Sequence, residues 1–233
     1  MQKSGNAQMV YTSLRNSILS LNLVPGAAIN EKDISVLYKV SRTPVREAFI
    51  TLSKEALITV MPQKGSIVSC IDLSRVKQEQ FIRESLETAA LKLFIEEYEN
   101  HQIAELEKCI DLQIEACNSR KPELFNKLDD QFHRIFFGSQ NVAWEAMQNT
   151  CGHYHRIRLL AIWIQGIIGD IVEEHKKILE AVKQRNVEES LAYLNSHIHK
   201  LSSEEAMLRR FFPDYFTDSE VTMPEVDFGG LRV

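Results

Sequence analysis

The sequence predicts a mainly α-helical protein with two parts, an N-terminal winged helix-turn-helix and a C-terminal antiparallel all-helical bundle. The first 70 residues contain the patterns of three short helices followed by a β-hairpin. The stretch 71–212 has almost no strand signal and repeats helical periodicity. The two parts also differ in charge. We therefore expect one domain at residues 1–70, a second at 71–212, and a C-terminal tail at 213–233.

The charge is unevenly distributed along the chain. The formal net charge of all 233 residues is −5. Residues 1–69 hold eight Lys and Arg against four Asp and Glu, so the rest of the chain holds 19 basic and 28 acidic residues. A basic N-terminal third on an acidic body indicates that the first part meets a polyanion such as DNA.

The composition is that of an ordinary globular protein, with 44% hydrophobic and 25% charged residues. No apolar run approaches the roughly 18 residues of a membrane span, and the N-terminus lacks the apolar segment of a signal peptide. We therefore expect no membrane partner and a cytoplasmic location. The four cysteines lack CxxC spacing and the density of a disulfide framework, so we expect reduced thiols.

The elements of the basic third follow from helical spacing and its breaks. A first helix ends before Pro25, and its apolar side is formed by Val10, Leu14, Ile18 and Leu21. The stretch "NEKDISVLYKV" predicts a second helix with Asn30 as its N-cap. Ser41 is expected to cap a third helix with Pro44 in its first turn. "LITVMPQKGSIVSC" has two β-branched runs around a turn, which is typical of a hairpin.

Two arginines, Arg42 and Arg46, lie four residues apart at the start of the third helix. In a winged helix-turn-helix this helix enters the major groove, where guanidinium groups and helix N-terminal N–H groups suit guanine and phosphate. Taken alone, such a pair is better explained by solvated surface arginines. The surrounding order of three helices and a hairpin favours DNA binding.

The stretch "PGAAINEKDISVLYKVSRTPVREAFITLSKEALITVMPQKGSIV" resembles the DNA-binding domain of the GntR family of bacterial transcription regulators, and "SRTPVREA" is its most distinctive part. The resemblance implies a homodimer that reads a palindromic double-stranded DNA operator. It also implies DNA contacts from the second helix, the recognition helix and the wing tip, namely Lys32, Ser41, Arg42, Thr43, Arg46, Lys64 and Gly65. Ala56 replaces a glycine that is common in the family, and we expect this to cost little.

Six helical segments are expected in the acidic body, the first capped by Ser74. Short polar or Gly-bearing breaks separate them: "SRVKQEQFIRESLETAALKLFIEEY", "QIAELEKCIDLQIEAC", "PELFNKLDDQFHRIFF", "NVAWEAMQNTCGHYHRIRLLAIWI", "IVEEHKKILEAVKQ" and "VEESLAYLNSHIHKLSSEEAMLRRFF". An antiparallel bundle is the natural packing of such segments. From Thr217 onward the helical periodicity is lost, and no role is assigned to this tail.

One set of residues in the bundle suggests a cation-binding site: Asp129, His133, His175 and His197. The first two lie at i and i+4 on one helix face, and the other two occupy inward positions of later helices. His199 lies about 200° round the helix from His197 and should point elsewhere. A single buried histidine is more often a hydrogen-bonded core residue, and Asp129 can pair with Arg134 or a neighbouring lysine. Three imidazoles and a carboxylate together favour a shared cation, because burying them unpartnered is costly.

The body resembles the FCD domain, the helical effector domain of the FadR-like subgroup of GntR regulators, in "FIRESLETAALKL", "DDQFH" and "EEHKKILEAVKQRNVEESLAYLNSHI". In metal-binding members the matching Asp and His positions hold one divalent cation per chain, and this ligand set suits zinc, nickel, cobalt, iron or manganese. Small carboxylate effectors can bind close to that metal. Arg83 matches an arginine that faces the cavity. The alternative is a surface ion pair between Arg83 and Glu87.

The sequence therefore predicts a ligand-responsive transcriptional repressor that binds its operator as a homodimer and senses a small carboxylate metabolite. The alternative function is a helical metalloenzyme with an appended winged helix, because the proposed ligand set leaves coordination positions open. No nucleophile–base pair or phosphate-binding glycine loop accompanies the metal positions. We therefore expect no catalytic residues and no enzyme activity.

Overall fold

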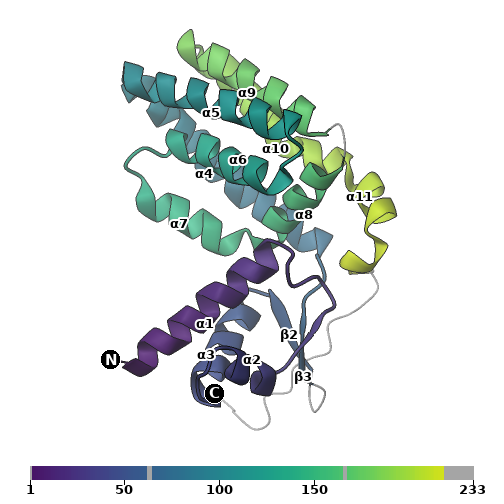
Figure 1. The fold of residues 1–233 in the computed structure, drawn as a ribbon. Coiled ribbons are helices and arrows are strands. Elements are labelled where there is room, and N and C mark those ends of the chain that lie inside the picture. Colours follow the sequence, from purple (N-terminus) through teal and green to yellow (C-terminus); the bar gives the residue numbers. More distant parts are fainter. Residues whose placement is uncertain (1, 62–64, 165–166, 218–233) are drawn as a thin grey trace, which may run out of the picture.

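The computed structural model describes residues 2–61, 65–164 and 167–217. Figure 1 shows a small winged domain beneath a larger helical bundle, and each part has its own hydrophobic core. The core of the winged domain is built around Leu14, Val45 and Leu52, and that of the bundle around Leu91, Phe132 and Ile178. The predicted fold class, a winged helix-turn-helix followed by an all-helical bundle, is confirmed.

Three helices and a three-stranded antiparallel sheet form the winged domain. They are α1 (Gln2–Leu19), β1 (Ala28–Ile29), α2 (Glu31–Leu37), α3 (Arg42–Lys54), β2 (Ile58–Met61) and β3 (Gly65–Val68). The strand order is β1-β3-β2, with Val60 opposite Ser66 and Ala28 opposite Ile67. The predicted hairpin is the β2–β3 pair, whereas β1 was not foreseen because two residues are too short to show an alternating pattern.

Local sequence signals explain how these helices begin. The side chain of Asn30 accepts a hydrogen bond from the N–H of Asp33, as expected of an N-cap. Ser41 occupies the N-cap position of α3, but its side chain makes no capping hydrogen bond. Ala56 has a φ of +56°, a left-handed conformation that favours glycine. An alanine there costs about 1–2 kcal/mol, which is more than the small cost expected from its size.

Eight helices and a 3₁₀ turn of the described chain form the bundle region. They are α4 (Leu73–Glu97), α5 (Asn100–Asn118), α6 (Pro122–Phe136), α7 (Asn141–Thr150), α8 (Gly152–Trp163), α9 (Ile167–Lys183), α10 (Val187–Ser203), α11 (Glu205–Phe211) and η1 (Pro213–Tyr215). None of the helices in the described ranges is both long and apolar enough to cross a bilayer.

Three details of the bundle differ from the sequence-based expectation, and one of them is that the segment expected as one helix over 187–212 is divided at Glu204 into α10 and α11. The N-cap of α4 is Asp72, whose side chain accepts from the N–H groups of Ser74 and Arg75, so the prediction of Ser74 as the cap was wrong. The segment expected as one helix over 141–164 is divided at Cys151. At this division Gly152 packs closely against the winged domain. A Cβ atom added to Gly152 would lie 2.9 Å from Leu57 Cδ2.

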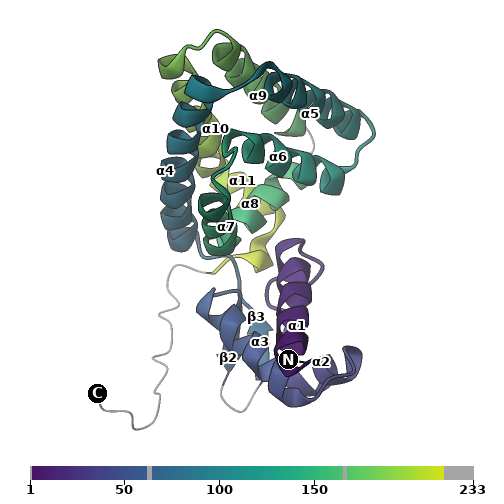
Figure 2. The same cartoon turned by 90° about the vertical axis from the view of Figure 1, so that its left-hand side faces the viewer.

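The N-terminal end of α8 holds the two domains together. The His153 Nε2 atom lies 3.1 Å from the carbonyl oxygen of Ala56, and its Nδ1 atom accepts from the N–H of Asp72 at 3.0 Å. The buried Arg156 donates from Nη1 to the carbonyl of Ser69 at 2.6 Å. From α1, Arg15 donates to the carbonyl of Gln148 at 2.6 Å. The turned view in Figure 2 shows α1 directly below the bundle.

The segment that joins the domains is also bound by the C-terminal end of the described chain. The N–H of Ile71 donates to the carbonyl of Tyr215 at 2.7 Å, and the N–H of Thr217 donates to the carbonyl of Ile71 at 3.1 Å. Phe216 pairs with Ile71 in a parallel bridge and is buried in the bundle core. Residues 213–217, expected as part of the tail, are therefore packed against the linker. Residues 218–233 lie outside the described chain.

Candidate functional site

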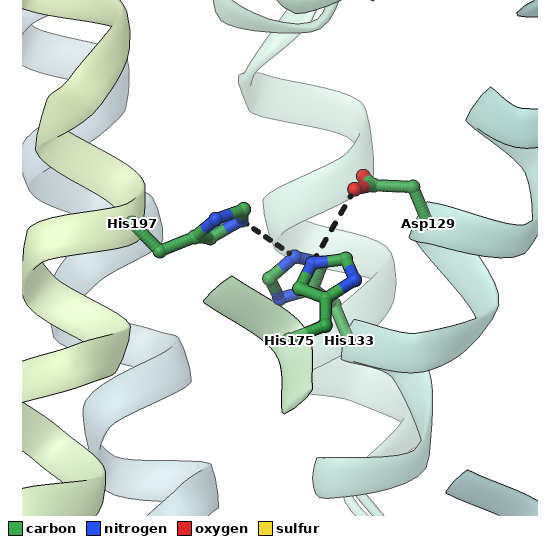
Figure 3. Close-up of side chains that lie close together, drawn as sticks. All are labelled: Asp129, His133, His175 and His197. Atoms are coloured by element: carbon green, nitrogen blue, oxygen red, sulfur yellow. Dashed lines mark hydrogen bonds and ion pairs between the residues drawn. The ribbon is translucent and has the colours of Figure 1, made fainter. Parts of the chain in front are cut away.

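Four buried side chains from three helices converge inside the bundle (Figure 3). Asp129 and His133 come from α6, His175 from α9 and His197 from α10. One potential ligand atom from each lies within 4.8 Å of the others. The Nε2 atoms of His133 and His197 are 3.2 Å apart, and His175 Nε2 is 3.6 Å from Asp129 Oδ1. The structure thus brings together the four side chains selected from the sequence.

Each histidine ring has an oxygen atom next to its Nδ1 atom. Gln113 Oε1 lies 2.8 Å from Nδ1 of His175, and Glu174 Oε2 lies 2.8 Å from Nδ1 of His197. Glu87 Oε2 is 2.8 Å from Nδ1 of His133, although the angle does not satisfy a hydrogen bond. Such partners favour a proton on Nδ1 and leave the Nε2 lone pair facing the centre. This is the arrangement that metal-binding histidines usually have.

Several atoms that face the centre make no hydrogen bond within the described chain. Both Asp129 carboxylate oxygens and His175 Nε2 are buried without a hydrogen bond. Two Nε2 lone pairs only 3.2 Å apart repel each other unless a proton or a cation lies between them. Two nitrogen ligands of one tetrahedral metal ion would be about 3.3 Å apart. The residues present therefore fit a transition-metal cation.

The protonation states also suit a cation. Burial, together with the positive charge of Arg83, holds the pKa of His133 well below its usual range. Burial and the neighbouring His197 do the same for the pKa of His175. Burial alone would raise the pKa of Asp129, but Arg158 and the histidines outweigh it and the pKa is lowered. Neutral imidazoles and an ionised carboxylate are the forms that ligate metals.

His199 points away from this cluster, as its position on the helix predicted. Its Nε2 atom lies 3.0 Å from Glu84 Oε2, and its side chain is 54% exposed. Its Nδ1 atom contacts Gln80. His199 therefore provides a control for substitutions of the clustered histidines, because it lies on the same helix as His197 and outside the site.

Arg83 forms the ion pair with Glu87 that the alternative interpretation named, at 2.6 Å, but the pair is buried. Its guanidinium lies 5.0 Å from the centre of the Tyr154 ring, and its Nη2 atom is buried without an acceptor. Because Glu87 also approaches His133, Arg83 is linked to the histidine cluster through one carboxylate. Arg83 is therefore part of the interior of the bundle.

Two small cavities share Arg158 and Tyr154 in their walls. The cavity next to the cluster is lined by Asp129, His197, Lys200 and Glu174 among others. The cavity between α4, α7 and α8 is lined by Arg83, Trp144 and Met147 among others, and none of its lining residues is acidic. Arg158 also pairs with Asp129 at 3.2 Å. Cationic side chains thus flank the cluster.

The described residues among those expected to contact DNA are exposed on the winged domain. Those on α2 and the N-terminal part of α3 are all exposed: Lys32, Ser41, Arg42, Thr43 and Arg46. The opposite face of α3 is buried through Val45, Phe49 and Leu52. Gly65 is exposed with a φ of +93°, which explains a glycine at this position of the wing. Lys64 lies outside the described residues.

Several residues around these sites were not identified from the sequence. Glu31, Gln113, Glu174 and Arg158 all contact a predicted site residue. Glu174 is next to His175, so its position in the chain was a usable signal. Gln113 lies 62 residues from the histidine it contacts, and no sequence pattern marks it.

Comparison with known families gives two matches, one in the winged domain and one in the bundle. Residues 6–68 match the family described as bacterial regulatory proteins, gntR family. Residues 80–200 match the FCD domain. The first match runs from within α1 to the end of β3, and the second contains all four clustered side chains.

Several known proteins and solved structures are similar over most of the chain. The HTH-type transcriptional repressor RspR of Escherichia coli K12 is 29% identical, over 91% of this chain and 93% of its own. The HTH-type regulator in the unstable DNA locus of Streptomyces ambofaciens is 32% identical, over 94% and 93%. The structure of E. coli McbR/YncC has a TM-score of 0.72 at 19% identity, covering 89% of this chain and 98% of that one. A GntR regulator from Rhodococcus sp. RHA1 gives 0.70 at 22% identity, covering 88% and 97%.

Proposed function

This chain belongs to the GntR family of bacterial transcription regulators and carries the FCD domain of the FadR-like subgroup, and from this premise we propose that residues 1–70 bind the operator while residues 71–212 sense a small molecule. The family and the relatives are transcriptional regulators and not enzymes, so the metalloenzyme alternative is wrong. We propose that the protein represses transcription, as the name of RspR states for that relative, and that it acts in the cytoplasm.

The observation that supports the sensing half is the orientation of the three clustered histidines. Their Nδ1 atoms face oxygen atoms and their Nε2 atoms face one point together with Asp129. We propose that Asp129, His133, His175 and His197 hold one divalent transition-metal ion per chain. Three nitrogen donors and one oxygen donor leave zinc, nickel, cobalt, iron and manganese as candidates.

The charges around the centre favour an anionic effector. Among the fully buried groups, the carboxylates of Glu87 and Asp129 are balanced by the guanidinium groups of Arg83 and Arg158. Asp130, which also pairs with Arg158, is partly exposed, and Glu174 pairs with Lys200. A divalent cation added to this balanced set leaves positive charge in a poorly solvated place, which a bound anion would neutralise. We therefore propose a small carboxylate effector, with Arg83 acting either on its carboxylate or through Glu87 and His133.

A second copy of the chain is the partner that family membership implies. Helix α4 has an outward stripe at four-residue spacing, from Phe81 through Ser85 and Ala89 to Leu93, in which Phe81 is 70% exposed and Leu93 is 45% exposed. We propose that this face packs against the same face of a second copy. Phe81→Glu should then yield monomers in light scattering and weaken operator binding. A dimer that persists in this variant would contradict the assignment of α4.

Elemental analysis of protein purified without chelator tests the metal site. The unmodified chain should carry up to one transition-metal ion per chain. His133→Ala and His197→Ala should lose the ion, while His199→Ala should keep it because His199 faces Glu84. Equal metal content in all three variants would mean that the cluster is not a metal site.

Operator titration by fluorescence anisotropy tests the coupling of the two domains. Carboxylates that shift the curve of the unmodified, metal-loaded protein should do so by about 5- to 150-fold. Arg83→Ala should abolish this shift and leave effector-free operator binding within a few-fold, with circular dichroism as the folding control. Arg75→Ala is the matched control, because Arg75 forms the same kind of i, i+4 pair on α4 with Glu79. If no small carboxylate shifts the wild-type curve, the sensing half of the proposal is wrong and the DNA-binding half remains.

A further inference from the structure

Arg46, the second arginine of the recognition helix, is held by an acidic residue from the neighbouring helix. Its Nε atom lies 3.1 Å from Oε1 of Glu31, and its Nη2 atom lies 3.1 Å from Oε2. Glu31 is the first residue of α2, and Arg46 lies one turn inside α3. Two parallel contacts between a guanidinium and a carboxylate fix the plane and direction of the guanidinium as well as its position.

This pair leaves one edge of the guanidinium available. Nε and one hydrogen of Nη2 face Glu31, so the Nη1 group and the other hydrogen of Nη2 point away from the carboxylate. The Arg46 side chain is 68% exposed, and none of the described residues offers an acceptor to Nη1. The free edge presents two parallel N–H groups, which is the pattern that pairs with N7 and O6 of guanine in the major groove.

The pair is too exposed to be explained by fold stability. Exposed ion pairs contribute little to folding, and Glu31 itself is 30% exposed. A carboxylate near bound DNA also repels phosphates, which opposes binding to any sequence. The Glu31 carboxylate favours binding in a different way, by ordering the Arg46 side chain beforehand. An arginine that is already ordered loses less side-chain entropy when it contacts a base. A fixed guanidinium also adapts less readily to a wrong base.

We propose that Glu31 is a positioning residue for DNA recognition, which holds Arg46 in the orientation that reads a guanine and lowers affinity for other sequences. The inference rests on the proposed contact of Arg46 with a base. It predicts two opposite effects of removing the carboxylate charge. Discrimination at the base pair read by Arg46 should fall, and affinity for unrelated DNA should rise.

The test uses the full-length protein and an operator selected from random duplexes. Arg46→Ala first identifies the symmetric operator position at which base preference is lost. Glu31→Gln, which keeps the shape of the side chain, is then titrated against the operator, against operators changed at that position, and against unrelated DNA. Glu47→Gln is the matched control, because it removes the same charge from an exposed site on α3. Thermal unfolding of each variant reports whether the winged domain is intact.

Glu31→Gln should lose about tenfold of the preference at the Arg46 position, within the range that a bidentate base contact contributes, while its affinity for unrelated DNA increases. Glu47→Gln should keep the preference. If Glu31→Gln discriminates like the unmodified protein, or if it weakens all DNA sequences equally, the inference is wrong while the contact of Arg46 stands. If Arg46→Ala changes the base preference at no operator position, the proposed base contact of Arg46 is wrong. The proposed role of Glu31, which depends on that contact, is then wrong as well.

Discussion

His153 makes the contact between the two domains sensitive to pH. The residue is 2% exposed, its Nε2 atom faces the carbonyl of Ala56, and its Nδ1 atom accepts from the N–H of Asp72. The contact at Nδ1 requires the neutral ring, because a protonated Nδ1 cannot accept, whereas Nε2–H can donate to the carbonyl of Ala56 in either form. Burial, followed by the positive charge of Arg156, lowers the pKa of His153 from 6.5 to about 3.

The lowered pKa fixes the sign of the effect. The unfolded chain takes up a proton at this histidine as the pH falls through about 6.5, whereas the folded chain does not until about pH 3. The stabilisation is therefore complete above pH 6.5 and is lost as the pH falls. Between pH 7 and pH 5 this one residue should remove about 2 kcal/mol from the free energy of unfolding. This change in the free energy of unfolding is the same for any folded-state pKa below about 4.

Urea unfolding at pH 7 and at pH 5, with chelator present throughout, measures this contribution. His153→Gln keeps a donor for the carbonyl of Ala56 and does not titrate, so it should lose about 2 kcal/mol less than the unmodified protein over the same interval. Other groups that titrate, including the metal-site histidines, cancel in this comparison. If both proteins lose the same free energy between the two pH values, His153 is not buried as a neutral ring at the domain contact.

Three further outcomes are expected. Lys32→Ala should weaken binding to all DNA sequences alike and reduce the slope of log affinity against log salt by about one, as measured by anisotropy at several salt concentrations. Gln113→Met removes the oxygen next to Nδ1 of His175 and should lower metal affinity about 10- to 100-fold, as measured by competition with a chelating dye. Thr217→Pro removes the N–H that donates to the buried carbonyl of Ile71 and should destabilise the protein by about 1–3 kcal/mol. Thr217→Ala keeps that N–H and should cost less, so equal stabilities of the two variants would mean that this hydrogen bond does not hold the linker.

Much of the architecture was predictable because the signals are local. Neighbouring residues determine where helices begin near Asn30 and Ser41, and they also form the β-branched runs of the hairpin. The structure has the expected elements at these places. The four clustered side chains were selected because i, i+4 spacing and apolar stripes show which side of a helix faces inward. The structure brings them together, and cation binding by them stays a prediction.

The remaining features depend on contacts between distant parts of the chain. The break at Cys151 has no proline to mark it and follows from the packing of Gly152 on Leu57, which is 95 residues earlier in the sequence. The position of Phe216 also depends on a distant contact. We expected it in a tail because the helical periodicity is lost there, but it pairs with Ile71. Periodicity reports which side of an element is buried, but it does not report which distant segment covers that side.

Helix α8 offers a physical route from the bundle cavities to the DNA-binding domain. Tyr154 and Arg158 lie at i and i+4 and line both cavities, while His153 and Arg156 lie at i and i+3 on another side and hold the linker. These side chains share one rigid helix of 12 residues, so a ligand that shifts the cavity side must also shift the contacts with the linker.

The carbonyl of Ser69 and the N–H of Asp72 are both bonded to α8, while Ile71 between them is bonded to the C-terminal segment. The linker therefore does not act as a flexible tether that would absorb such a shift. Because an effector can alter operator affinity only by favouring one arrangement of the winged domains over another, the proposed function requires a stiff connection of this kind, through which a shift at the bundle cavities would move the winged domain.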